Sequence, residues 1–236
     1  MKRGNMLKKD LILKSPVSKT IGFDNVRDGK FGAVLSRAGV GKTSFLVQIA
    51  LTQLLNDDKI LHISLDDHMK KINLRYSDGY KNLVNYIGYV DPQKAVRVWE
   101  DIKTNEVGIS YNETTFDIEK IRDYLRSFKK SDIALPTIMI IDGLNFDKDV
   151  TKIFEKLEKL NQEFSIFTWV SMKSHRDEKL SKDGFPLQLE TYKEKFDKAI
   201  FLQPVKDKIE AVILKDGNRT DQKYKLDPST MMIIDE

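Results

Sequence analysis

The sequence contains no cysteine, and this absence excludes several kinds of site at once. Disulfide bonds, thiolate metal sites and cysteine nucleophiles all need that side chain. A chain without disulfides suits a reducing interior, so we expect a cytoplasmic protein. No apolar run approaches the roughly 18 residues that a membrane helix needs, and residues 1–9 lack the apolar stretch of a signal peptide. We therefore expect no association with a membrane.

An excess of charge of one sign is also lacking. The chain has 40 basic and 36 acidic side chains, for a formal net charge of +4. That excess is too small to indicate a protein dedicated to nucleic acid or to a membrane surface, so any such contact must be local. The start is locally basic, with Lys2, Arg3, Lys8 and Lys9. We expect residues 1–21 to form a solvated basic arm, with phosphate binding by the arm as the alternative.

What the sequence does contain is a set of short apolar runs rich in Val and Ile. The chain has 236 residues, 40% of them apolar, enough for one large core. Several runs are apolar on both faces, as the central strands of a parallel sheet are. The runs lie at residues 31–35, 59–65, 137–141, 165–170, 199–202 and 209–214.

Helical patterns lie between these runs, at residues 43–56, 118–128 and 149–162. Thr114 and Asp117 resemble a capping box before the second of them. Strands alternating with helices predict an α/β fold with a mostly parallel central sheet flanked by helices. After Phe196 strands follow one another without helices, which predicts antiparallel strands at the C-terminal edge of the sheet. We expect residues 22–236 to form a single domain.

A glycine-rich loop joins the first predicted strand to the first predicted helix. Gly39 and Gly41 let backbone N–H groups turn toward phosphate oxygens, the helix N-terminus adds partial positive charge, and Lys42 places a full charge where the β and γ phosphates of a nucleotide lie. This context predicts a P-loop rather than only a turn that enters a helix. Ser36 stands where the strict pattern has glycine. The predicted nucleotide-binding residues are Ser36, Arg37, Ala38, Gly39, Val40, Gly41, Lys42, Thr43 and Ser44.

A magnesium site is predicted beside this loop. Magnesium prefers oxygen ligands, and a nucleotide-bound ion is usually held by one or two protein side chains and by phosphate. The Thr43 hydroxyl is one candidate ligand, and Asp142, at the end of the strand run 137–141, is the other. The alternative is that Asp142 only forms a turn before Gly143. The predicted cofactors are ATP and Mg²⁺.

Two carboxylates, Asp66 and Asp67, follow the second predicted strand. The carboxyl ends of parallel strands form the edge at which ligands bind in such folds, so one of the two can orient or deprotonate a water for hydrolysis. The alternative is that they cap the helix that begins near His68. We prefer the capping role for Asp67 and leave both roles open for Asp66.

These residues carry a resemblance to RecA-type ATPases, in the branch of bacterial replicative helicases (DnaB-like) and KaiC-like proteins. The resemblance starts at the lead-in 22–32, includes the phosphate loop, and continues at Ser64-Leu65-Asp66, which is followed at the family's spacing by Ile72 and Arg75. It implies a RecA-like P-loop fold and ATP hydrolysis. The family's catalytic glutamate falls on Asp66, one methylene shorter, so we expect the activity to be weak.

The resemblance also implies a γ-phosphate sensor and an oligomer. The family's sensor glutamine is not matched, and Ser171 and His175 are the candidate substitutes. The segment from Lys215 to Arg219 is similar to a turn whose basic residues reach the nucleotide of a neighbouring subunit, although Asp216-Gly217 could equally be a simple hairpin turn. Such trans-acting fingers, with Lys215 and Arg219 as candidates, imply a homo-oligomer in a ring or filament, with a hexamer as one form.

Residues 171–198 correspond to the family's contacts with single-stranded nucleic acid. Their charges nearly cancel, and Phe185, Tyr192 and Phe196 are the candidate stacking groups. A solvated loop would explain the same composition. Two functions therefore stay open. One is a helicase-like or recombinase-like accessory that couples ATP hydrolysis to single-stranded nucleic acid. The other is a nucleotide-dependent oligomeric switch that binds protein partners and hydrolyses ATP slowly or not at all.

Overall fold

The structure, a computed structural model, describes residues 2–20, 30–175, 181 and 185–234, with only the backbone described at residues 2–5, 219 and 221. The strands are β1 (Phe31–Ser36), β2 (Ile60–Ser64), β3 (Glu106–Ser110), β4 (Ile138–Asp142), β5 (Phe167–Lys173), β6 (Phe196–Val205), β7 (Lys208–Asp216) and β8 (Asn218–Leu226). They form one sheet in the order β3-β2-β4-β5-β1-β6-β7-β8.

The sheet has a parallel part and an antiparallel part. β1 lies between β5 and β6 and is parallel to both, and β2 is parallel to β3 and β4. β6, β7 and β8 are joined by tight turns and pair antiparallel, with Gly217 in the left-handed region at the second turn. The predicted mostly parallel sheet with antiparallel C-terminal edge strands is confirmed.

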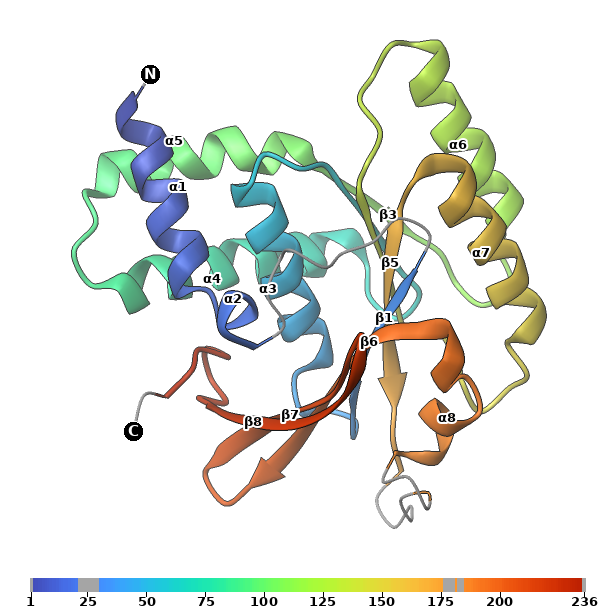
Figure 1. Cartoon of the computed structure of the whole chain (residues 1–236). Helices are drawn as coiled ribbons and strands as arrows, with labels where there is room; N and C mark the ends of the chain where they lie inside the picture. Colours follow the sequence, from blue (N-terminus) through green and yellow to red (C-terminus); the bar gives the residue numbers. More distant parts are fainter. Residues whose placement is uncertain (1, 21–29, 176–180, 182–184, 235–236) are drawn as a thin grey trace.

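Helices cover both faces of the sheet (Figure 1). One face carries α1 (Lys2–Lys14), α2 (Pro16–Thr20), α3 (Lys42–Leu55), α4 (Met69–Ile87) and α5 (Pro92–Ile102). The other face carries α6 (Ile118–Lys130), α7 (Thr151–Phe164) and the short α8 (Leu187–Glu190). Two further turns are 3₁₀-helical, η1 (Lys103–Asn105) and η2 (Lys193–Lys195). Each face has its own apolar cluster, so the core is two layers divided by the sheet.

The helices near the site form where the sequence predicts them. α3 is buried nearly all round because α1, α2 and α4 pack against it while it rests on the sheet. Asp117 caps α6, its side chain accepting a hydrogen bond from the Glu119 N–H. Within the described residues, no helix is both long and apolar enough to cross a bilayer.

The N-terminal segment differs from the expected solvated arm. α1 packs against α3, α4 and α5, with Leu11 fully buried. Lys8 is 8% exposed, and its Nζ donates to Asp57 at 2.5 Å and to Asp101 at 2.6 Å. A lysine that reads as solvated in the sequence is therefore neutralised by two carboxylates distant in the chain. Residues 21–29, which include the lead-in motif, lie outside the described part.

Candidate nucleotide-binding site

The phosphate loop connects β1 to α3 through residues 37–41. Gly41 is the N-cap of α3 with φ 117°, and Gly39 has φ 79°, backbone conformations that L side chains rarely adopt. No side chain caps α3 at its start. The first N–H groups of the helix therefore remain available to an anion, which the partial positive charge of the helix end also favours.

Lys42 points back into this loop. Its Nζ donates to the carbonyl oxygens of Ser36 and Arg37, each at 3.2 Å. Burial lowers the pKa of Lys42, although the nearby carboxylates of Asp142 and Asp66 act to raise it. Phosphate oxygens would be stronger acceptors than these carbonyls because hydrogen bonds between ionised groups are the stronger ones.

An open cavity of about 770 Å³ lies over the loop and is large enough for a small-molecule ligand. Of the predicted nucleotide-binding residues, Ala38 to Ser44 line it. Ser36 and Arg37 do not. Ser36 is fully buried with its Oγ donating to the Arg37 carbonyl at 2.8 Å, and the Arg37 side chain is exposed outside the cavity. Both contribute backbone oxygens to Lys42 rather than a face of the cavity.

The cavity also reaches the carboxyl edge of the sheet, where Asp66, Asp142, Ser171 and Lys173 line it. Asp142 ends β4 and is 6% exposed, with its carbonyl oxygen accepting from the Leu65 N–H at 2.8 Å. Thr43 lines the same cavity. A hydroxyl and carboxylates at one edge are the hard oxygen donors that magnesium takes, so the described donor set fits that ion.

Asp66 lies against the backbone of the loop after β4. A Cβ atom at Gly143 would be 2.7 Å from the Asp66 Cγ, and Gly143 has φ 97°, so glycine is required on both counts. Burial raises the pKa of Asp66, and the negative charges of Asp142 and Asp67 raise it further. A carboxylate with a raised pKa accepts a proton more readily, which suits a general base.

The preferred capping role of Asp67 is wrong. The N-cap of α4 is His68, and no side chain caps that helix start. Asp67 instead forms ion pairs within and beside the helix, with Lys71 Nζ at 2.7 Å and with Arg75 Nη2 at 3.6 Å. Its own N–H donates to Ser64 Oγ at 3.0 Å.

The structure separates the two sensor candidates. Ser171 is buried, lines the cavity, and its Oγ accepts a hydrogen bond from the Gly143 N–H at 2.8 Å. His175 lies beyond the end of β5, exposed, with Nε2 2.7 Å from Asp147 Oδ1. Lys173, between them, lines the cavity, and its charge contributes to the pKa shifts of both Lys42 and Asp66. Lys173 is thus a better-placed cation than the sequence pattern indicated.

Arg75 is a site residue that the sequence reasoning did not assign. It lines the cavity from α4, and its Nη1 lies 3.5 Å from Ser44 Oγ. Its Nε is buried without a hydrogen-bond partner among the described residues. The signal in the sequence was its position nine residues after Asp66. The turn at residues 228–231 also lines the cavity, with Met231 against Gly41, and no sequence pattern marked it.

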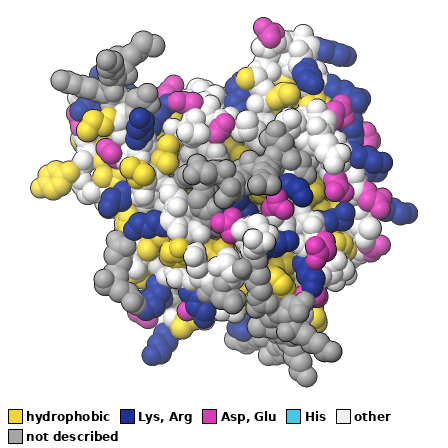
Figure 2. All heavy atoms as spheres, in the orientation of Figure 1, with side chains coloured by type: hydrophobic (Ala, Val, Ile, Leu, Met, Phe, Trp, Pro, Cys, Tyr) yellow, Lys and Arg dark blue, Asp and Glu magenta, His cyan; other side chains and the backbone are white. Residues whose placement is uncertain are grey.

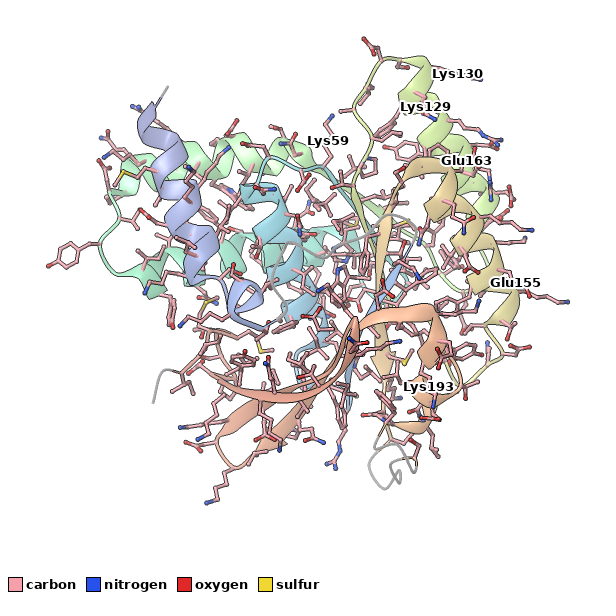
Figure 3. All side chains as sticks on the ribbon, in the orientation of Figure 1. Lys59, Lys129, Lys130, Glu155, Glu163 and Lys193 are labelled. Carbon is pink, nitrogen blue, oxygen red and sulfur yellow. The ribbon has the colours of Figure 1, made fainter. Side chains whose placement is uncertain are left out.

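The finger candidates lie at the opposite edge of the sheet. β1 is parallel to β6, with Phe31 beside Phe196 and Ser36 beside Leu202, and the turn at Gly217 lies next to the start of β6, where Lys198 pairs with Asp216. Lys215 Nζ donates to the carbonyl of Lys193, which is labelled in Figure 3, at 3.0 Å. The side chain of Arg219 lies outside the described part. Neither residue can therefore be placed in this chain's own cavity by the fold.

The proposed stacking aromatics are mostly in the core. Phe196 is fully buried and Phe185 is 7% exposed, so the expectation that they stack on bases is wrong. Tyr192 stacks on Phe154 with ring centroids 5.4 Å apart. Residues 176–180 and 182–184 of the same segment lie outside the described part.

Comparison with known proteins supports the fold. No protein-family model matches the sequence, and no curated protein matches it. Among solved structures, the ATPase domain of a DnaB-like replicative helicase matches with a TM-score of 0.65 and 17% sequence identity, covering 91% of this chain and 86% of that chain. The predicted resemblance is confirmed at the level of fold: the chain adopts the RecA-like ATPase fold seen in DnaB-like helicases.

Proposed function

We propose that this protein binds ATP with magnesium and hydrolyses it weakly, acting as a homo-oligomer. One observation carries the proposal. The phosphate loop, Lys42, Asp142 and Asp66 come from separate segments of the chain and meet at a single cavity. Ala38 to Ser44 would hold the phosphates, Thr43 and Asp142 would hold the magnesium, and Lys42 would neutralise phosphate charge.

Asp66 is the proposed general base. It would orient the attacking water and take its proton, and the raised pKa favours that acceptance. Bound magnesium would neutralise charge that develops on the phosphates. Asp66 has a shorter reach than glutamate, so the water would be held less well and turnover would be slow.

Two variants test the site. Lys42→Ala should weaken magnesium-ATP binding by on the order of 100-fold or more, because Lys42 makes several charge-assisted hydrogen bonds to phosphate. Asp142→Asn should weaken binding in magnesium more than in chelator, because it removes charge beside the metal at constant volume. Calorimetric titration measures both, with Lys129→Ala on the outer end of α6 as the control. Unchanged affinity in Lys42→Ala, or equal loss with and without magnesium in Asp142→Asn, would contradict the assignment.

The oligomer proposal draws support from the position of the β7–β8 turn. Basic residues at the edge opposite the cavity can act on a nucleotide only across a heterologous subunit interface, which forms a ring or a filament. Specific activity should then rise with protein concentration. Mixing Asp66→Asn with Arg219→Ala subunits should restore some activity at interfaces that carry neither change. A sedimenting monomer whose activity does not depend on concentration would rule out a trans-acting finger.

The second candidate function is a nucleotide-dependent switch without a polymer substrate. Figure 2 shows basic and acidic side chains interspersed over the visible face rather than gathered by sign, and this arrangement favours a protein partner over single-stranded nucleic acid. Salt-dependent binding of single strands that stimulates turnover would favour the helicase-like function. Nucleotide-dependent assembly without that binding would favour the switch.

A further inference from the structure

A buried polar pair lies behind the nucleotide cavity, between β2 and α4. His62 Nδ1 and Tyr76 Oη are 3.0 Å apart, and their rings pack edge to face with centroids 5.7 Å apart. His62 is fully buried and Tyr76 is 2% exposed. The surrounding cluster is apolar, so this bond is a specific connection between strand and helix within a contact that is otherwise non-directional.

The pair sits one residue from Arg75. Successive residues on a helix are rotated by about 100°, so when Tyr76 points at the sheet, Arg75 points sideways along it. In the structure that direction leads to Ser44, at the start of α3. A small rotation of α4 about its axis would move the guanidinium away from the phosphate loop. The His62–Tyr76 bond opposes that rotation because it fixes which side of α4 faces β2.

Arg75 itself is in a state that a phosphate would complete. Its contact with Ser44 is 3.5 Å and its ion pair with Asp67 is 3.6 Å, both long, and its buried Nε has no partner in the described part of the chain. A buried donor without an acceptor is costly. An oxygen of a phosphate held by the loop would supply the acceptor and a matching charge.

We propose that His62 and Tyr76 are positioning residues: their hydrogen bond sets the rotation of α4 and so holds Arg75 at the phosphate loop, where it contacts nucleotide phosphate. This role rests on the proposed function, since it needs a nucleotide at that loop. Neither ring touches the ligand.

Calorimetric titration of the full chain with magnesium-ADP tests the proposal. Arg75→Gln should raise the dissociation constant by about 12- to 150-fold, the range for losing a charged hydrogen bond. Tyr76→Phe should raise it by about 2- to 12-fold, the range for losing one neutral hydrogen bond. Because Tyr76 acts through Arg75, the double variant should bind no more weakly than Arg75→Gln alone.

Tyr80→Phe is the matched control. Tyr80 lies one turn further along α4, is also buried, and donates its hydroxyl hydrogen bond to the Ala95 carbonyl at 2.8 Å, toward α5 instead of β2. It should lower the melting temperature as Tyr76→Phe does and leave nucleotide affinity unchanged. An equal loss of affinity in Tyr80→Phe, or losses in Arg75→Gln and Tyr76→Phe that multiply in the double variant, would show a merely structural role and overturn the proposal.

Lys42→Ala separates this proposal from the function on which it rests. If Lys42→Ala loses binding and Tyr76→Phe binds as the wild type does, the site stands and the positioning role is wrong. If Lys42→Ala binds normally, the phosphate loop is not the site and both proposals fail.

Discussion

The two helical layers of this protein treat polar groups in opposite ways. Beneath α4, the ionisable residue His62 is fully buried and Glu106 is partly buried, and His62 Nε2 and Glu106 Oε1 have no hydrogen-bond partner within the described residues. Beneath α7, the fully buried Asn161 is neutral and satisfied, accepting from Thr168 Oγ1 at 2.7 Å and donating to the Lys30 carbonyl at 3.4 Å.

Charges follow the same division. Outside α6 and α7 the charged side chains meet at the surface, where Arg122 and Arg126 both pair with Glu163. Figure 3 shows Glu163 on α7, and Lys129 and Lys130 at the end of α6. On the α4 side, burial instead lowers the pKa of His62 to about 4 and raises that of Glu106 to about 7. Perturbed groups gather near functional sites more often than elsewhere, so the α4 layer serves the site and the α7 layer serves stability.

The largest effect that would sharpen this contrast is on turnover. Asp66→Asn should lower the ATP hydrolysis rate by about 10²- to 10⁴-fold, the usual contribution of a general base. Affinity for ATP should change little, because the base acts on water rather than on the bound nucleotide. Steady-state kinetics measure both quantities. Glu155→Gln, on the outer face of α7 in Figure 3, is the control and should change neither.

Asp66→Glu extends the same test. A higher rate in that variant would show that the reach of the shorter side chain limits turnover. Equal turnover in the wild type and in Asp66→Asn would contradict the assignment and would transfer the role to another group at the cavity or to none.

Much of the fold could be predicted because its local signals agree with its tertiary environment. The central strands are apolar on both faces and become buried on both, and the glycines of the phosphate loop take the backbone angles that their spacing implies. The edge strand β3 was missed because it is short, half-exposed and contains Gly108, so no apolar run marks it. α1 was missed because its stripe of Leu7 and Leu11 is interrupted by lysines.

The site was less predictable than the fold. Sequence spacing brings Lys42, Thr43 and Asp142 to one edge because strand ends do so in any parallel sheet. Arg75 and Lys173 could not be assigned in that way, since their position depends on the rotation of α4 and on the length of β5. The buried bond between His62 and Tyr76 joins residues on a strand and a helix, and no period in the sequence links them.

The comparison between the layers also predicts opposite pH dependences. A glutamate whose pKa is raised by burial, as at Glu106, binds a proton more tightly in the folded state. Its contribution to stability is complete below the unfolded value of 4.5 and is lost as pH rises toward about 7. At Glu163 burial raises the pKa, but hydrogen bonds from Arg126 and Arg122 outweigh it and lower the pKa overall. That contribution is lost as pH falls through the lowered pKa.

Glu106→Gln should therefore raise the free energy of unfolding at pH 8 by about 1–3 kcal/mol, because the neutral amide removes a buried charge. The gain should shrink as pH falls to 5, where Glu106 is already protonated. Denaturant titration at a series of pH values measures it, and the difference from the wild type cancels the titration of His62, which both proteins share. Glu163→Gln is the matched control and should lose about 0–1 kcal/mol at pH 8, as surface ion pairs do. A pH-independent effect at Glu106, or a loss of stability at pH 8, would mean that its carboxylate is solvated and that the two layers do not differ as described.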